Sequence, residues 1–270
     1  MPTKRQLIPD ILLMVGFAFW AIAQASFGEP DQKKAPQYKV TETEIQLPGV
    51  TISRVTSEIR LDAVACLESG ILEYVVCKPN TFEHEAIFTT TAKPELVHAA
   101  LLLIGVEANP QRPGLAELWF EKALKQESSR VSVEVEWKEK GKLKRVPLAS
   151  LLRKREEVEP GIDPEEKKNL KVEEAWVFAG SFIHQNPETG EREYAGNQSG
   201  ILVGIWPNPS TVIQYGISEG NPYEGKNLGM EIREDRVPKI GTKVKLVFSR
   251  FTQAAEKSKE TTKSKLKKSK

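Results

Sequence analysis

Residues 131–137, which read Val-Ser-Val-Glu-Val-Glu-Trp, alternate strictly between apolar and polar side chains up to the final Trp. Side chains of a β-strand point in turn to its two faces, so this pattern predicts a strand with one buried and one wet face. Short segments of similar character recur along the chain, separated by turns that contain Gly, Pro or Asn. The recurrence predicts a β-rich fold.

A hairpin is predicted around Ser69-Gly70, between strands at residues 60–67 and 71–77. With these two residues as the loop, one face of the pair is wholly apolar, which favours this register over a one-residue slip. That face collects Leu61, Ala63, Ala65, Leu67, Leu72, Tyr74 and Val76. Further strands are expected at residues 84–91, 143–146, 175–184, 193–195, 200–206, 211–215, 230–233 and 242–249.

One helix with clear ends is predicted at residues 94–104. Pro94 opens it and Gly105 follows it, and these residue types are favoured at those positions. The segment is apolar almost all round, with Glu95 and His98 as its polar edge, so the helix should be mostly buried. The expected fold class is α+β: a β-rich domain with mainly antiparallel strands and one well-buried helix, built as one unit or as two strand-rich halves.

Residues 1–25 have the pattern of a secretory signal peptide. A positively charged start precedes an uninterrupted apolar run at residues 11–23, and Ala23-Gln24-Ala25 fits the small-x-small pattern of a cleavage site. The run is shorter than the roughly 20 apolar residues that span a bilayer. We therefore expect cleavage before Ser26 and a secreted or periplasmic protein with no transmembrane helix in the mature chain. A retained N-terminal anchor is the alternative.

Composition divides the remaining chain into a polar spacer (26–39), a folded domain (40–252) with a charged internal loop (about 152–173), and a Lys-rich tail (253–270) that is expected to be disordered. The formal net charge of +2 is unevenly spread, because the tail carries +5 and the domain with its spacer about −4. A mildly acidic domain does not resemble a nucleic-acid-binding surface. The partners to expect are an envelope protein, or an anionic envelope polymer reached by the tail.

The two cysteines, Cys66 and Cys77, leave two states open. Paired cysteines in an exported protein suggest a disulfide. In the predicted hairpin, however, they lie four residues apart along the ladder, about 13 Å, whereas a disulfide needs Cα atoms within about 7 Å. A disulfide and two free thiols are both compatible with the sequence, which has no Cys-x-x-Cys redox motif.

Candidate binding residues gather at the start of the predicted helix: His84, Glu85, Thr91 and Lys93. A helix N-terminus exposes backbone N–H groups that attract anions, and hydroxyl groups and a lysine would add to that attraction. Ordinary helix capping is the alternative explanation for the same residues.

Metal binding or catalysis around His84, Glu85 and His98 is a further hypothesis. Adjacent residues of a strand point to opposite faces, so His84 and Glu85 could not both reach one ion without a local distortion. The sequence has no H-E-x-x-H motif. We therefore predict no metal and no cofactor, and we assign no catalytic residue.

Three stretches resemble the YdjY-domain family of exported bacterial proteins. They are Gly70-Ile-Leu-Glu-Tyr74; His84-Glu-Ala-Ile-Phe-Thr-Thr-Thr-Ala-Lys-Pro94 with Val97-His-Ala-Ala-Leu-Leu-Leu-Ile-Gly105; and Trp176-Val-Phe-Ala-Gly-Ser181 with Tyr194-Ala-Gly-Asn-Gln-Ser-Gly200 and Pro207-Asn-Pro-Ser210. The resemblance implies a single exported domain of unsettled function and supplies no reaction or partner. Some relatives are labelled ferredoxin-like, but an iron–sulfur cluster is normally held by four cysteines, and this chain has two.

Taken together, these features favour an exported, non-catalytic binding or interaction module of the bacterial envelope. An exported enzyme or metal-binding protein with a site around His84, Glu85 and His98 is the alternative.

Overall fold

The computed structural model describes residues 38–111, 114, 116–155, 172–225 and 228–252. The expected signal peptide, all but the end of the polar spacer, most of the charged loop and the Lys-rich tail after Thr252 lie outside these described residues.

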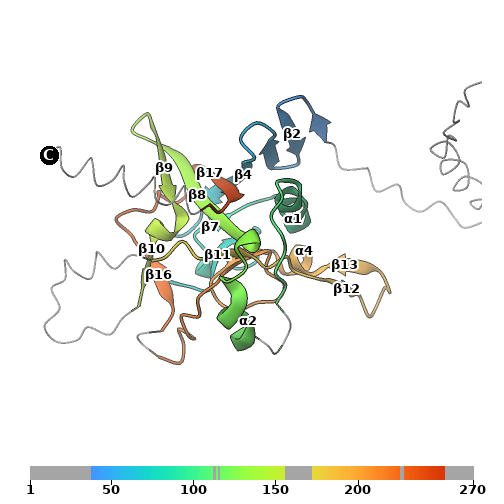
Figure 1. Cartoon of the computed structure of the whole chain (residues 1–270). Coiled ribbons are helices and arrows are strands. Elements are labelled where there is room, and N and C mark those ends of the chain that lie inside the picture. Colours follow the sequence, from blue (N-terminus) through green and yellow to red (C-terminus); the bar gives the residue numbers. More distant parts are fainter. Residues whose placement is uncertain (1–37, 112–113, 115, 156–171, 226–227, 253–270) are drawn as a thin grey trace, which may run out of the picture. The chain divides into compact units, whose positions relative to one another are not determined.

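Eight strands close into a barrel (Figure 1). In order around the wall they are β4 (Ile59–Ala65), β17 (Lys243–Arg250), β8 (Arg130–Glu139), β11 (Trp176–Phe178), β15 (Ile213–Tyr215), β14 (Ile201–Gly204), β6 (Tyr74–Cys77) and β7 (Phe88–Thr89). The ring closes because β7 pairs with β4, where Val64 lies opposite Thr89. The β-rich fold with few helices was predicted, whereas closure was not.

The barrel wall is a mixed sheet and not the mainly antiparallel one expected. The pairs β14–β15 and β6–β7 are parallel, and the other neighbours in the wall are antiparallel. A parallel pair needs a connection that brings the chain back to the starting end. Residues 78–87 supply it between β6 and β7, and residues 205–212 supply it between β14 and β15.

The wall branches at two strands. One edge of β4 pairs with β17, and its other edge is shared between β3 and β7. Likewise, one edge of β8 pairs with β17 and the other is shared between β11 and β9. The strands outside the barrel on these branches are β1 (Lys39–Val40), β2 (Glu44–Leu47), β3 (Val50–Ser53) and β9 (Lys142–Pro147).

Strands from the two halves of the sequence are interleaved around the barrel. The last strand, β17, lies between β4 and β8, and β11, β15 and β14 lie between β8 and β6. The two strand-rich halves are therefore parts of one closed wall. Two small sheets complete the strands: β10 (Leu152–Lys154) with β16 (Met230–Ile232) and β5 (Ile71–Leu72), and the hairpin of β12 (Ile183–Gln185) with β13 (Arg192–Tyr194).

The hairpin predicted around Ser69-Gly70 does not form. Residues 59–65 form β4 and residues 74–77 form β6, but β7 lies between these two strands. Ile71–Leu72 pair instead with β16. Alternation specifies which face of a strand is buried, and every neighbour in the barrel satisfies that requirement equally well. The pattern therefore predicted the inward face of β4 and not its partner.

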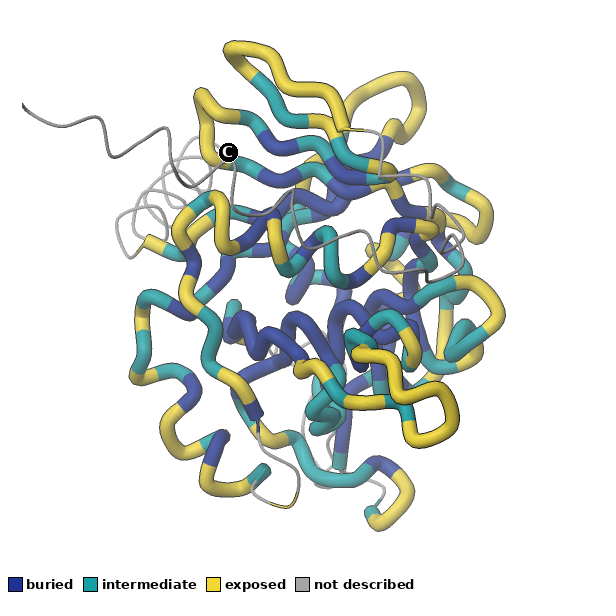
Figure 2. Tube along the Cα trace, turned by 90° about the vertical axis from the view of Figure 1, so that its right-hand side faces the viewer, coloured by how far each residue is buried: buried dark blue, intermediate teal, exposed yellow. Residues whose placement is uncertain are grey.

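The barrel encloses the main hydrophobic core. Ile59, Leu61, Ala63 and Ala65 of β4 are buried, and Asp62 and Val64 between them face outward. Trp176 and Tyr215 meet edge to face inside the wall, with ring centroids 5.1 Å apart. Figure 2 shows the buried positions concentrated along the strands and the exposed ones at turns and hairpin tips. Burying each large apolar side chain is worth about 1.5–3 kcal/mol.

The α-helices in the described residues are α1 (Pro94–Leu103), α2 (Ala116–Ala123) and α4 (Ala195–Ser199), with 3-10 turns η2 (Glu83–Glu85), η3 (Glu127–Ser129) and η4 (Leu148–Leu151). Helix α1 begins at the predicted residue and ends one residue earlier than predicted, but it is less buried than expected. Val97 and Leu101 are buried, whereas Leu102 and Leu103 are 50% and 62% exposed. The helix contacts α4 and β3 and keeps its opposite face in solvent. No helix in the described part of the chain is long and apolar enough to cross a membrane.

Candidate functional site

The sequence predicted that His84 and Glu85 lie on a strand, and this prediction is wrong. The two residues form the 3-10 turn η2. His84 is exposed, and its Nε2 lies 3.8 Å from a carboxylate oxygen of Glu85. Tyr223 also contacts that carboxylate, and its hydroxyl donates a hydrogen bond of 2.6 Å to it. Glu73 also lies close by, and burial, together with the negative charge of Glu85, raises the pKa of the Glu73 carboxyl. Sequence analysis missed both Tyr223 and Glu73.

The start of α1 is capped and does not form an open anion site. The side-chain oxygen of Asn197 in α4 accepts a hydrogen bond of 3.1 Å from the backbone N–H of Glu95. Lys93 pairs with the Glu95 carboxylate at 3.6 Å, and Thr91 lies at the edge of a separate groove. The four predicted binding residues therefore do not share a pocket among those formed by the described residues. Capping, the alternative explanation, describes this helix end.

Both cysteines are free thiols in the structure. Cys66 continues the β4 edge, since its backbone N–H donates to the carbonyl of Ile87, and Cys77 pairs with Thr89 on the far side of β7. Two strand spacings, about 9–10 Å, thus separate them across the sheet. Burial, with smaller effects from Cys77 and Glu83, raises the pKa of the Cys66 thiol to about 12.

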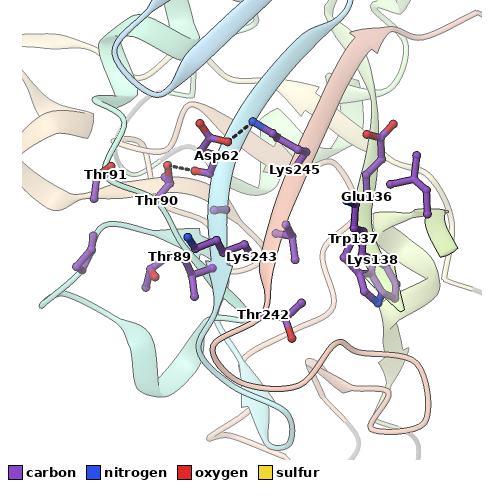
Figure 3. Close-up of a pocket in the computed structure, with 15 residues that line it drawn as sticks. Asp62, Thr89, Thr90, Thr91, Glu136, Trp137, Lys138, Thr242, Lys243 and Lys245 are labelled. Carbon is purple, nitrogen blue, oxygen red and sulfur yellow. Dashed lines mark hydrogen bonds and ion pairs between the residues drawn. The ribbon is translucent and has the colours of Figure 1, made fainter. Parts of the chain in front are cut away.

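A groove of about 870 Å³ crosses the outer wall of the barrel. It passes over β4 and β17, between threonines 89–91 at the end of β7 and the hairpin of β8 and β9 (Figure 3). Its walls are mostly apolar and include Val64 and Leu143, which are 37% and 68% exposed. This volume is near the upper end of ordinary ligand pockets, about 300–1,000 Å³.

The acidic side chains of this outer groove are already paired. Asp62 pairs with Lys245, as Figure 3 shows. Glu136 pairs with Arg60 at 2.7 Å and with Arg145 at 3.1 Å. The remaining charged groups in its lining are Lys138 and Lys243, and neither makes an ion pair or side-chain hydrogen bond within the described residues. The groove therefore presents two available positive charges on an apolar surface.

A second concavity, the His98 cleft, has a volume of about 680 Å³. It lies between α1 and the β12–β13 hairpin, and its lining is Glu95, His98, Gly180, Ser181, Phe182, Ile183, Arg192 and Tyr194. Nδ1 of His98 lies 2.7 Å from the carbonyl oxygen of Gly180 and 2.9 Å from the hydroxyl of Tyr194. Rings of Phe178 and Tyr194 pack edge-on against the imidazole, at centroid distances of 4.9 and 5.5 Å.

The hydrogen bonds of His98 define its tautomer. The Gly180 carbonyl can only accept, so Nδ1 carries the proton and Nε2 carries the lone pair. Burial lowers the pKa of His98, against an opposing effect of the hydrogen bond to Gly180, and this favours the neutral ring. Nε2 makes no hydrogen bond within the described residues and so is free to accept one from a ligand.

The backbone at Gly180 and Ser181 has an unusual conformation, and these two residues form hydrogen bonds with His98 of α1 and with Gly196 of α4. Gly180 and Ser181 both have left-handed conformations, with φ of 84° and 54°, which is uncommon for serine. The Ser181 hydroxyl accepts a hydrogen bond of 3.0 Å from the N–H of Gly196 in α4. These two residues break the strand predicted over 175–184 into β11 and β12. The Gly-Ser pair in an otherwise apolar run was the one sequence signal that could have revealed the break.

Other catalytic arrangements find little support in the structure. Residues 216–220 read Gly-Ile-Ser-Glu-Gly, the spacing of a nucleophile elbow, but they lead into turns and not into the helix that such an elbow requires. Within the described part of the chain, no group of three His, Cys, Asp or Glu side chains is placed to hold a metal ion. His84, Glu85 and His98 accordingly do not form a metal centre here.

The geometry defines a closed β-rich barrel, and the described residues form two ligand-sized concavities on its surface. A model of the YdjY domain matches residues 50–249, and the chain belongs to this family. No curated protein and no solved structure matches the chain. The second and third stretches that resemble the family meet in space: His98, Gly180, Ser181 and Tyr194 line one cleft, and Asn197 caps the helix that carries His98.

Proposed function

We propose that the chain is an exported, non-catalytic binding module of the bacterial envelope, and that its outer groove holds an extended acidic segment of a partner protein. The observation that carries the proposal is the pairing of charges in the groove. Asp62 and Glu136 are neutralised by neighbours, which leaves Lys138 and Lys243 to attract carboxylates.

An extended peptide suits this groove better than a compact ligand. The groove is open to solvent and passes over β4 and β17 from Thr91 on one side to Lys138 of β8 on the other (Figure 3). Its apolar floor can bury alternate side chains of a strand-like segment, while hydroxyls of Thr89 and Thr242 at its edges can bond to peptide groups. Acidic residues at the alternating positions would then reach the two lysines.

A direct binding measurement tests the proposed function. Labelled hexapeptides of alternating Glu and Leu, and of alternating Lys and Leu, are titrated with residues 26–270 and followed by fluorescence anisotropy. We expect the acidic peptide to bind and the basic one not to bind. The double variant Lys138→Ala/Lys243→Ala should weaken binding at least tenfold.

The matched control removes Lys122 of α2 and Lys125 in the turn after it, both outside the groove lining, as Lys122→Ala/Lys125→Ala. This variant has the same net charge as the groove variant, so it separates local contacts from general electrostatic attraction. Equal weakening by both double variants, or equal binding of both peptides, would refute the groove as the docking site.

Export is a separate part of the proposal and rests on the pattern of residues 1–25. Expression in a bacterial host followed by N-terminal sequencing of the protein from the periplasm or medium tests it. We expect the mature chain to begin at Ser26. A chain that keeps its first residues and sediments with membranes would show a retained anchor instead.

An enzyme is the second candidate function, favoured by the contact between Glu73 and Glu85. A carboxyl with a raised pKa beside a second carboxylate is an arrangement used for proton transfer. A panel of chromogenic esters, glycosides and phosphates tests this candidate. Turnover that is lost in Glu85→Gln would establish an enzyme, and no turnover on any substrate supports the binding module.

A further inference from the structure

The His98 cleft brings groups of four kinds together around one space. His98 and Glu95 come from α1, and Arg192 comes from β13 of the hairpin opposite. Phe182 and Ile183 add apolar surface, with exposed fractions of 40% and 57%. The cleft therefore has a hydrogen-bond acceptor, a carboxylate, a guanidinium and an apolar wall within about 680 Å³.

The acceptor in this cleft is fixed in place. The imidazole of His98 is held at Nδ1 by the Gly180 carbonyl and is packed between Phe178 and Tyr194. Such contacts prevent the ring from turning, so Nε2 keeps one direction. A ligand N–H can bond to it without any cost of ordering the side chain.

Within the described residues, the guanidinium of Arg192 makes no ion pair and no side-chain hydrogen bond, although Glu95 lines the same cleft. The Glu95 carboxylate has a weak, exposed contact with Lys93 at 3.6 Å. The two charges that line the cleft thus do not neutralise each other, and a ligand with two opposite charges could contact both.

We infer that the His98 cleft binds a small zwitterion with an apolar side chain, of which an α-amino acid is the simplest example. Its carboxylate pairs with Arg192, for which the planar guanidinium offers two parallel N–H donors. Its ammonium donates to Nε2 of His98 and to the Glu95 carboxylate. Its side chain covers Phe182 and Ile183. This site is separate from the proposed peptide groove and does not depend on it.

Isothermal titration calorimetry with residues 26–270 tests the inference. The probes are L-phenylalanine, 3-phenylpropionate, which lacks the ammonium group, and 2-phenylethylamine, which lacks the carboxylate. We expect phenylalanine to bind and each analogue to bind at least tenfold more weakly. Absence of measurable phenylalanine binding at millimolar concentration would overturn the inference, and so would equal affinity for any analogue.

Variants locate the site. Arg192→Gln should weaken phenylalanine binding at least tenfold. His98→Asn keeps a side-chain N–H that can donate to the Gly180 carbonyl but removes Nε2, and it should also weaken binding. Unchanged affinity in Arg192→Gln would place the ligand elsewhere and overturn the inference. Thermal unfolding of both variants shows whether the fold is retained. If His98→Asn is unfolded, the affinity of Arg192→Gln for phenylalanine alone decides the test, because Arg192 is exposed and its replacement should not disturb the fold.

The groove variant Lys138→Ala/Lys243→Ala is the matched control. It should bind phenylalanine as the unchanged protein does, while Arg192→Gln should bind the acidic hexapeptide normally. The two proposals can therefore fail independently, because one variant removes only peptide binding and the other removes only phenylalanine binding.

Discussion

The side chain of Asn197 caps the helix that begins at Pro94, by accepting a hydrogen bond of 3.1 Å from the backbone N–H of Glu95. The two residues are 102 positions apart in the sequence, so the cap joins α4 to α1 as well as closing a helix end. The N-cap residue itself, Lys93, makes no capping bond with its side chain. A tertiary contact has replaced the usual local one.

We predict that Asn197→Ala destabilises the fold by about 1 kcal/mol, the usual cost of losing a cap. Asn197→Asp should retain most of the stability, because a carboxylate also accepts the bond and interacts favourably with the helix dipole. Chemical denaturation measures both. Equal loss in the two variants would show that Asn197 acts through packing and not as a cap.

Gly180→Ala and Gly241→Ala form a matched pair that separates backbone strain from packing. Both glycines have nearly the same left-handed φ, 84° and 83°. A Cβ on Gly180 would lie 2.9 Å from the Cβ of Ala108, whereas one on Gly241 meets nothing within 4 Å. Gly241→Ala should cost about 1–2 kcal/mol from conformation alone. Gly180→Ala should cost about 1–3 kcal/mol more from overpacking.

Denaturation midpoints of the two glycine variants provide the measurement. Equal destabilisation would mean that the backbone near His98 can shift away from Ala108. In that case the left-handed conformation alone would explain why glycine occupies position 180.

Arg145 links three carboxylates on the outer wall: Glu58 at 2.9 Å, Glu134 at 2.6 Å and Glu136 at 3.1 Å. Burial raises the pKa of Glu58, but hydrogen bonds and charges from Arg145 and Arg60 outweigh it and hold the pKa below 4.5. The unfolded chain then takes up this proton at a higher pH than the folded one. The contribution of Glu58 to stability is complete above the ordinary pKa of a glutamate. It is lost as the pH falls through the lower pKa that Glu58 has in the folded protein.

We predict that Arg145→Met destabilises the protein at pH 7 by about 1–3 kcal/mol, because three partly buried carboxylates each lose one charged donor. Below pH 4.5 the free energy of unfolding should also fall less steeply with decreasing pH in the variant. The reason is that the pKa of Glu58 rises towards its ordinary value once Arg145 is removed. Unfolding curves at several pH values test this. A parallel shift of the whole profile would contradict the assigned role of Glu58.

The positions of Cys66 and Cys77 predict two free thiols even after export. β7 separates the strands that carry them by about 9–10 Å, beyond the roughly 7 Å that a disulfide allows. The raised pKa of Cys66, about 12, and the raised pKa of Cys77 should also slow alkylation of the folded protein. Thiol titration without reductant should give two thiols per denatured chain, reacting slowly before denaturation. A titration that finds no thiols would show that Cys66 and Cys77 form a disulfide, which requires β7 to move from its place between them.

Much of the local structure could be predicted from the sequence. The alternation at residues 131–137 identified β8, and Pro94 with Gly105 gave the ends of α1 within one residue. Strand partners could not be predicted in the same way, because an apolar face packs equally well in any position around a barrel. The assignment of β4 and β6 to one hairpin failed for that reason.

The candidate sites depend on contacts that no local pattern contains. The His98 cleft needs Arg192 and the turn at Gly180, which lie more than 80 residues from His98. The outer groove is selected by which charges are paired, and Glu136 is paired through Arg60 and Arg145 from two other strands. The His84-Glu85 pair attracted attention because of its residue types, yet His84 is exposed on a short turn.

The place of β17 between β4 and β8 has a consequence for how the domain is made. Until residues 243–250 have been synthesised, β4 and β8 each have an unpaired edge where β17 will lie. An unpaired strand edge readily pairs with another chain. The barrel thus cannot close from its N-terminal part alone, and its final strand completes it in one late, long-range step. Shortened chains that end before Lys243 should accumulate as aggregates, and a separately supplied peptide of residues 243–250 could act as the missing strand.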